Sequence, residues 1–96
     1  MKILIGSIGP DGQPNINAGD IFEGQDYLDM LKMMIDPPFF TMNTEKDPSQ
    51  FIDNCLFNIF KVSGLELRIP GDTIEARAEN FFRTLIKHGL AVWMDN

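Results

Sequence analysis

The sequence contains few of the side chains on which most enzymes rely. It has one cysteine, Cys55, and one histidine, His88, and the two lie on different predicted elements. A nucleophilic cysteine needs a base beside it, and neither a serine nor an acid is predicted next to His88. A single cysteine also excludes an internal disulfide, which favours a reducing compartment. We therefore expect no catalytic residues and interpret Cys55, which lies in an apolar run, as a small buried core residue.

Long hydrophobic runs and cofactor motifs are absent too. No stretch of 18 apolar residues occurs, and the apolar segment at residues 3–5 is too short for a signal peptide. The protein is therefore expected to be cytoplasmic and not to bind a membrane. Glycines at positions 6 and 9 follow a predicted strand, but they precede a proline rather than a helix and lack the Gly-Lys-Ser/Thr of a phosphate loop. The spacing of a calcium-binding loop is missing. We expect neither a cofactor nor a metal.

Basic residues are scarce. Eight Lys and Arg stand against 14 Asp and Glu, which gives a net charge of −6 and a sequence pI near 4.5. Residues 1–60 carry nine acids and three lysines, whereas residues 61–96 carry five of each sign, so the first 60 residues hold the whole excess. An acidic surface repels phosphate backbones and argues against nucleic-acid binding. It favours a partner with a basic surface, although solubility alone explains the charge equally well.

Hydrophobic residues are abundant. They make up 44% of the 96 residues, against 23% charged residues, which is the balance of a globular chain rather than a disordered one. A chain of this size buries about 65% of its surface on folding, enough for one core without disulfides. We find no repeat and no linker-like stretch. The sequence therefore predicts one globular domain over residues 1–96.

The hydrophobic periodicity alternates between strand and helix. Residues 2–8 have two apolar faces, as a central strand does, and residues 13–20 are either a hairpin return or a loop. The expected helices cover 25–35, 48–62 and 73–88, and the further strands cover 39–42, 65–69 and 90–94. This predicts an α/β or α+β two-layer sandwich of about three helices on about four strands, in the order β-(β)-α-β-α-β-α-β. Whether the sheet is parallel or mixed stays open, and the alternative is a mostly helical domain with a small winged sheet.

Two of the helices have clear start signals. Asp47, followed by a proline and then Gln50, is a capping box for the second helix, and Gly64 is placed to end it. Asp72 and Glu75 repeat the capping-box spacing for the third helix. The apolar stripes of these two helices predict the following buried residues: Phe51, Leu56, Phe60, Phe81 and Leu85.

Two features near the first helix are candidates for binding a partner. An acidic run steps by three residues from Asp20 to Asp29, and such a run is either a solvated helix face, the more common case, or a docking strip. Met30 and Met33 widen the apolar arc of that helix beyond what one buried face requires, so they are either core or interface. Trp93 either covers the second face of the sheet, which we favour, or anchors a partner. The candidate partner-binding residues are Asp20, Glu23, Asp26, Asp29, Met30 and Met33.

These features together favour a small acidic protein-interaction module that binds another protein, as a regulator or an inhibitor. Small inhibitors of the kind that phages encode belong to this class. A structural or self-assembling homo-oligomeric subunit is the first alternative, because the apolar excess would also suit contacts between copies. A small enzyme is the second, and the lack of a recognisable catalytic set argues against it.

Overall fold

The chain begins with a β-hairpin. The structure, a computed structural model, describes residues 1–9, 11–35 and 46–94. In it β1 (Lys2–Ile8) pairs antiparallel with β2 (Pro14–Glu23), and the amide of Gly12 donates to the carbonyl of Gly9 at 2.9 Å within the turn. Of the two interpretations of residues 13–20, the hairpin return is therefore confirmed, and the strand extends to Glu23.

A third strand completes the sheet on the other side of β1. β3 (Ala91–Trp93) pairs antiparallel with β1, which gives the strand order β2-β1-β3. The prediction that residues 2–8 form the central strand is confirmed. The sheet is antiparallel and has three strands rather than about four, and the predicted strand at 39–42 lies outside the described residues.

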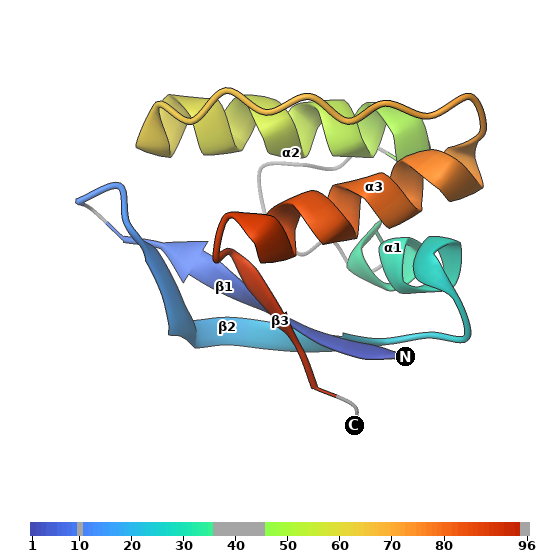
Figure 1. The fold of residues 1–96 in the computed structure, drawn as a ribbon, viewed down its shortest axis with the longest axis horizontal. Coiled ribbons are helices and arrows are strands. Elements are labelled where there is room, and N and C mark those ends of the chain that lie inside the picture. Colours follow the sequence, from blue (N-terminus) through green and yellow to red (C-terminus); the bar gives the residue numbers. More distant parts are fainter. Residues whose placement is uncertain (10, 36–45, 95–96) are drawn as a thin grey trace.

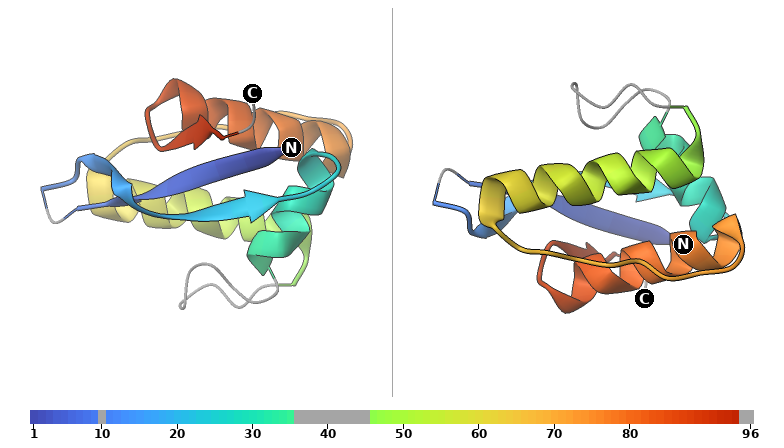
Figure 2. Two further views of the ribbon diagram at one scale, coloured as in Figure 1. Left: turned by 90° about the horizontal axis from the view of Figure 1, so that it is seen from below. Right: turned by 90° about the horizontal axis from the view of Figure 1, so that it is seen from above.

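Three helices cover one face of this sheet. They are α1 (Tyr27–Ile35), α2 (Pro48–Ser63) and α3 (Ile74–Lys87). α2 and α3 lie side by side over the sheet, and α1 lies at one end (Figures 1 and 2). The fold is therefore a compact two-layer α+β arrangement. Its radius of gyration of 12.2 Å agrees with the value of about 12.5 Å expected for a chain of this length.

The ends of α2 form as the sequence predicts. The side chain of Asp47 accepts a hydrogen bond from the amide of Gln50 at 3.0 Å, so it satisfies a donor that the first turn leaves free. At the other end Gly64 has a φ of 75°, and its amide donates to the carbonyl of Phe60 at 2.8 Å. This left-handed conformation suits glycine, which has no Cβ.

The cap of α3 differs from the prediction by one residue. The side chain of Thr73, not that of Asp72, accepts from the amide of Ala76 at 3.1 Å. Threonine and aspartate are both good N-caps, so the sequence locates this helix start only to within a residue.

Residues 65–69 do not form the predicted strand. The segment at residues 64–73 contains no strand and runs back beside α2 and over α3 (Figures 1 and 2), where the side chains of Arg77 and Asn80 donate to the carbonyls of Ile69 and Pro70. Leu65, Leu67 and Ile69 point inward, whereas Glu66 and Arg68 are exposed. An extended chain alternates its side chains whether or not it pairs with a strand, so the alternation predicted the conformation correctly and the sheet pairing wrongly.

This long return makes α2 and α3 run in the same direction, as the colours in Figure 1 show. A helix of 16 residues is about 24 Å long, and ten extended residues span up to about 33 Å. The segment is therefore long enough to carry the chain from the end of α2 back to the level of its start, where α3 begins.

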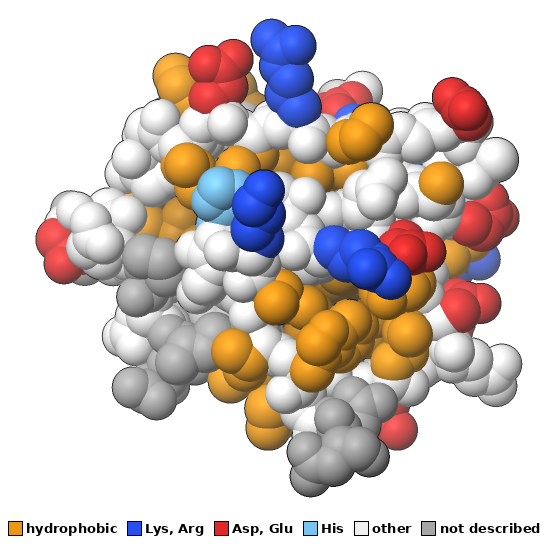
Figure 3. Space-filling model, viewed as in Figure 1, with side chains coloured by type: hydrophobic (Ala, Val, Ile, Leu, Met, Phe, Trp, Pro, Cys, Tyr) orange, Lys and Arg blue, Asp and Glu red, His pale blue; other side chains and the backbone are white. Residues whose placement is uncertain are grey.

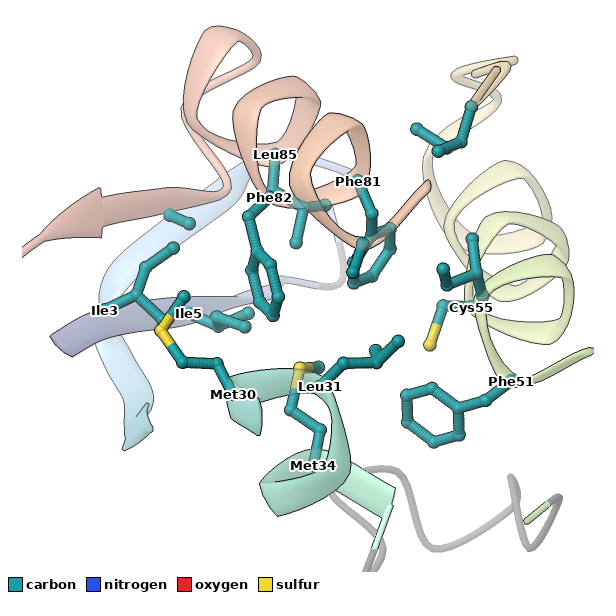
Figure 4. Packing of buried hydrophobic residues seen from close by; sticks show 14 of the residues in the cluster. Ile3, Ile5, Met30, Leu31, Met34, Phe51, Cys55, Phe81, Phe82 and Leu85 are labelled. Atoms are coloured by element: carbon teal, nitrogen blue, oxygen red, sulfur yellow. The ribbon is translucent and has the colours of Figure 1, made fainter. Parts of the chain in front are cut away.

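The core lies between the helices and the inner face of the sheet. Leu31 and Met34 of α1 project between Phe51 of α2 and Phe81 of α3 (Figure 4). Of the five predicted core residues, Phe51, Phe81 and Leu85 are buried and Leu56 is half-buried. Phe60 is exposed, which contradicts the prediction. It lies at the margin of the apolar stripe of α2, beyond the arc that the sheet and α3 cover.

Candidate functional site

The face of the sheet that points away from the helices carries an apolar row. The strand register places Leu4 between Ile21 of β2 and Val92 of β3. Directly paired residues lie on the same face of a sheet, and the neighbours of Leu4 on β1, Ile3 and Ile5, point into the core. The row Ile21–Leu4–Val92 is therefore on the outer face, where the side chain of Ile21 is 54% exposed and that of Val92 is 40% exposed.

A charged pair and a methionine border this row. Lys2 pairs with Glu23 in the register, and their side-chain charges are 4.0 Å apart. On the other side of Lys2, the amide of Met94 donates to the carbonyl of Lys2 at 3.0 Å and continues the ladder. Met94 is also exposed, two residues after Val92. We call this surface, formed by Lys2, Leu4, Ile21, Glu23, Val92 and Met94, the open sheet face.

The four acids of the predicted docking strip have different roles in the structure. Asp26 accepts a hydrogen bond from the amide of Asp29 at 2.8 Å, and the side chain of Asp29 accepts from the amide of Gln25 at 3.0 Å. These two acids therefore cap the start of α1. Glu23 belongs to the open sheet face, whereas Asp20, three residues earlier on β2, pairs with Ile5 and lines a pocket. All four acids are exposed, but the structure does not arrange them as one strip.

The two candidate methionines have different environments. Met30 is completely buried in the core, so the expectation that it contacts a partner is corrected, because the sheet and α3 already cover that side of α1. Met33 is 49% exposed. Of the two interpretations, core therefore applies to Met30, whereas Met33 stays a candidate for an interface.

Trp93 does not cover the second face of the sheet, contrary to the interpretation we favoured. It pairs with Ile3, and so it lies on the side of the helices. Its ring is 5.9 Å from that of Tyr27 in an edge-to-face arrangement, and Tyr27 is 6.3 Å from Phe82. Figure 3 shows hydrophobic side chains gathered below α3, between β3 and α1, where these elements meet. This aromatic cluster closes the edge of the core and leaves Trp93 partly exposed.

A pocket of about 660 Å³ opens between the end of β1 and the C-terminal halves of α2 and α3. Its inner wall is apolar and includes Ile59, Leu85 and Leu90, which are nearly buried. Four residues with polar side chains complete the lining: Ser7, Asp20, Asn58 and Lys61. Sequence reasoning missed this pocket, because its lining comes from segments far apart in the chain and none of them carries a recognisable motif.

The one cysteine, the one histidine and the acids do not gather at one place among the described residues. Among them, no three His, Cys, Asp or Glu side chains come together as metal ligands. Cys55 is buried and His88 is exposed at the end of α3. No described helix combines the length and the apolar character that crossing a bilayer requires.

Outside the sheet, α2 also exposes large hydrophobic side chains. Phe57 and Phe60, three residues apart, lie on its solvent side, and Phe57 is 63% exposed.

No protein-family model, curated protein or solved structure matches this chain.

Proposed function

We propose that this protein is a binding module that uses its open sheet face to bind another protein, one whose surface has an apolar centre and a basic rim. The observation that carries the proposal is the row Ile21–Leu4–Val92. Three branched aliphatic residues stand side by side across all three strands on a face that no described helix covers. Single exposed apolar residues are ordinary on protein surfaces, whereas a contiguous patch is typical of an interface.

The surrounding charge supports a basic partner. Residues 1–35 contain five acids and two lysines, and one of the acids, Glu23, borders the apolar row directly. A net negative charge attracts a partner with a basic surface and raises the association rate. Two copies of a chain with a net charge of −6 repel each other, so the overall charge disfavours self-association and favours a heterologous partner of opposite charge.

The proposal can be tested by site-specific photo-crosslinking in cells that produce the chain. A benzoyl-phenylalanine at position 92 is expected to link the partner, whereas the same group at position 57, on the exposed side of α2, is expected not to. The linked protein is then purified, and its binding to the unmodified chain is measured. We expect the double substitution Ile21→Gln, Val92→Thr to weaken binding by roughly tenfold or more, because apolar residues at an interface centre carry most of the affinity.

The matched control is Phe57→Gln, which removes an equally exposed apolar side chain from the other layer and should leave the affinity unchanged. Light scattering on the same variants addresses the homo-oligomer alternative. If the protein self-associates and the double substitution abolishes this, the open sheet face is a contact between copies and the proposal fails. A partner that binds with equal affinity to the double variant would overturn it too.

A further inference from the structure

The pocket lies where the β1–β2 pairing is irregular. The register passes from Ile5–Asp20 to Ser7–Asn15, so Gly6 alone faces residues 16–19 of β2. The amide of Gly6 instead donates to the carbonyl of Leu90 at 2.8 Å, on the other side of β1. Such bulges redirect side chains and recur next to binding sites. Here Gly6, Ser7 and Asp20 all line the pocket.

A glycine holds the two strands close together beside the pocket. A Cβ on Gly19 would overlap the carbonyl group of Ile5, so only glycine fits there without a shift of the backbone. Asp20 follows directly and pairs with Ile5. The backbone of Asp20 is therefore held by a tightly packed pair of strands rather than by a free loop.

The volume of the pocket suits a small organic molecule. Its volume of about 660 Å³ lies within the range of about 300 to 1,000 Å³ that ligand pockets have. Its apolar wall is made of core residues, such as Leu85 and Leu90, whose side chains pack tightly from behind. A wall of this kind keeps its shape without a ligand, which lowers the cost of ordering a site on binding.

The charges of the lining select the head group of the ligand. Asp20 comes from β2 and Lys61 from α2, so a carboxylate and an ammonium are on different walls. A purely anionic head group would be repelled by Asp20, and a purely cationic one would be repelled by Lys61. A zwitterion has a charge that complements each of them. Ser7 and Asn58 add groups that can hydrogen-bond to either end of such a head.

We propose that this pocket binds a small zwitterionic amphiphile, a molecule of the amino-acid class with a large apolar side group. The apolar part lies against Ile59, Leu85 and Leu90, and the charged head lies between Asp20 and Lys61. This site is separate from the open sheet face, and its test does not depend on the proposed protein partner.

Three probes with the same carbon chain and different heads test the assignment: 2-aminooctanoate, octanoate and octylamine. Titration calorimetry on the whole protein is expected to show saturable one-to-one binding of 2-aminooctanoate, roughly tenfold tighter than that of either singly charged probe. Asp20→Asn should reduce the difference in affinity between 2-aminooctanoate and octanoate. Lys61→Met should reduce the difference in affinity between 2-aminooctanoate and octylamine. A general loss of folding would weaken all three probes together and could not produce this crossed pattern.

A pair of substitutions on α2 locates the binding. Val62 lines the pocket and is half-exposed, so Val62→Trp should fill the opening and abolish binding of 2-aminooctanoate. Phe57→Trp, on the opposite side of the same helix, should have no effect. Equal affinities for the three probes, no saturable binding, or binding that survives Val62→Trp would overturn the proposal.

Discussion

The guanidinium of Arg77 lies 2.6 Å from a carboxylate oxygen of Asp53, and this ion pair ties α3 to α2. The same guanidinium donates to the carbonyl of Ser49 at 3.0 Å and to that of Ile69 at 3.1 Å. One side chain therefore connects both parallel helices and the segment at residues 64–73 that returns between them. The Arg77 side chain is 17% exposed, whereas that of Asp53 is 51% exposed.

This asymmetry predicts that the two partners contribute unequally to stability. Arg77→Met should lower the free energy of unfolding by about 2–3 kcal/mol, because it leaves part-buried carbonyls without a donor. Asp53→Asn should cost less than about 1 kcal/mol, since its ion pair is largely solvent-exposed. Urea denaturation of both variants measures the difference. Equal losses would show that the ion pair itself, rather than the carbonyl contacts, holds the helices together.

Two phenylalanines test the extent of the core. Phe81→Ala should destabilise the protein by about 3–5 kcal/mol, the usual cost of truncating a buried phenylalanine, because Phe81 is 1% exposed. Phe57→Ala should change stability by no more than about 0.5 kcal/mol. Thermal or urea unfolding compares them directly, and a large loss for Phe57→Ala would mean that α2 is rotated relative to this structure.

A side chain at Gly19, where β2 comes close to β1, should lower the stability of the fold measurably. Gly19→Ala should destabilise the fold by about 1–3 kcal/mol, as overpacking does, because its methyl group would overlap backbone atoms of Ile5 and Gly6. Amide hydrogen exchange should also accelerate in the β1–β2 pair. Gly64→Ala is the comparison: a Cβ there meets no atom within 4 Å, and its cost comes from the left-handed φ of 75° at the end of α2, so it should lower stability without a preferential effect on exchange in the β1–β2 pair.

Glu23, the acid of the open sheet face, should influence the rate of partner binding. Glu23→Lys should slow association with the crosslinked partner, since rim charges act mainly on the on-rate. Glu66→Lys changes the net charge equally but lies beside α3, in the helix layer on the other side of the sheet, so it should have little effect. The difference should shrink as salt shortens the screening length below about 8 Å. Equal association rates for the two variants would show that Glu23 is not part of the binding surface.

The single thiol reports on opening of the core. Cys55 is fully buried, so a thiol reagent should modify it only when the structure opens. Its labelling rate should therefore rise with urea in parallel with unfolding. Rapid labelling of the native protein would show that the region around α2 opens locally, without global unfolding.

Local signals in the sequence predicted most of the helices and strands. The caps at Asp47 and Gly64 are decided by residues within one turn of each helix end, and such signals can be read from the sequence directly. The central position of β1 followed from its two apolar faces. The pairing of residues 65–69 was beyond such reasoning, because hydrogen-bond partners of an extended segment are set by the tertiary arrangement and not by its own pattern.

The candidate sites were harder to predict for the same reason. Met30 and Met33 look alike in the sequence, and only the placement of α1 against α3 buries one and exposes the other. Phe60 looked like core because it continues the stripe of α2. The row Ile21–Leu4–Val92 joins three strands from distant parts of the chain, so no segment alone indicates it.

The strand order has a consequence for the time course of folding. One edge of β1 pairs with β2 within the hairpin. Its other edge pairs with residues 91–93, which come much later in the sequence. A two-stranded hairpin is marginally stable in water, and closing so long a loop slows folding. During synthesis, β1 therefore emerges from the ribosome before β3, and its unpaired edge is exposed to other chains until β3 follows.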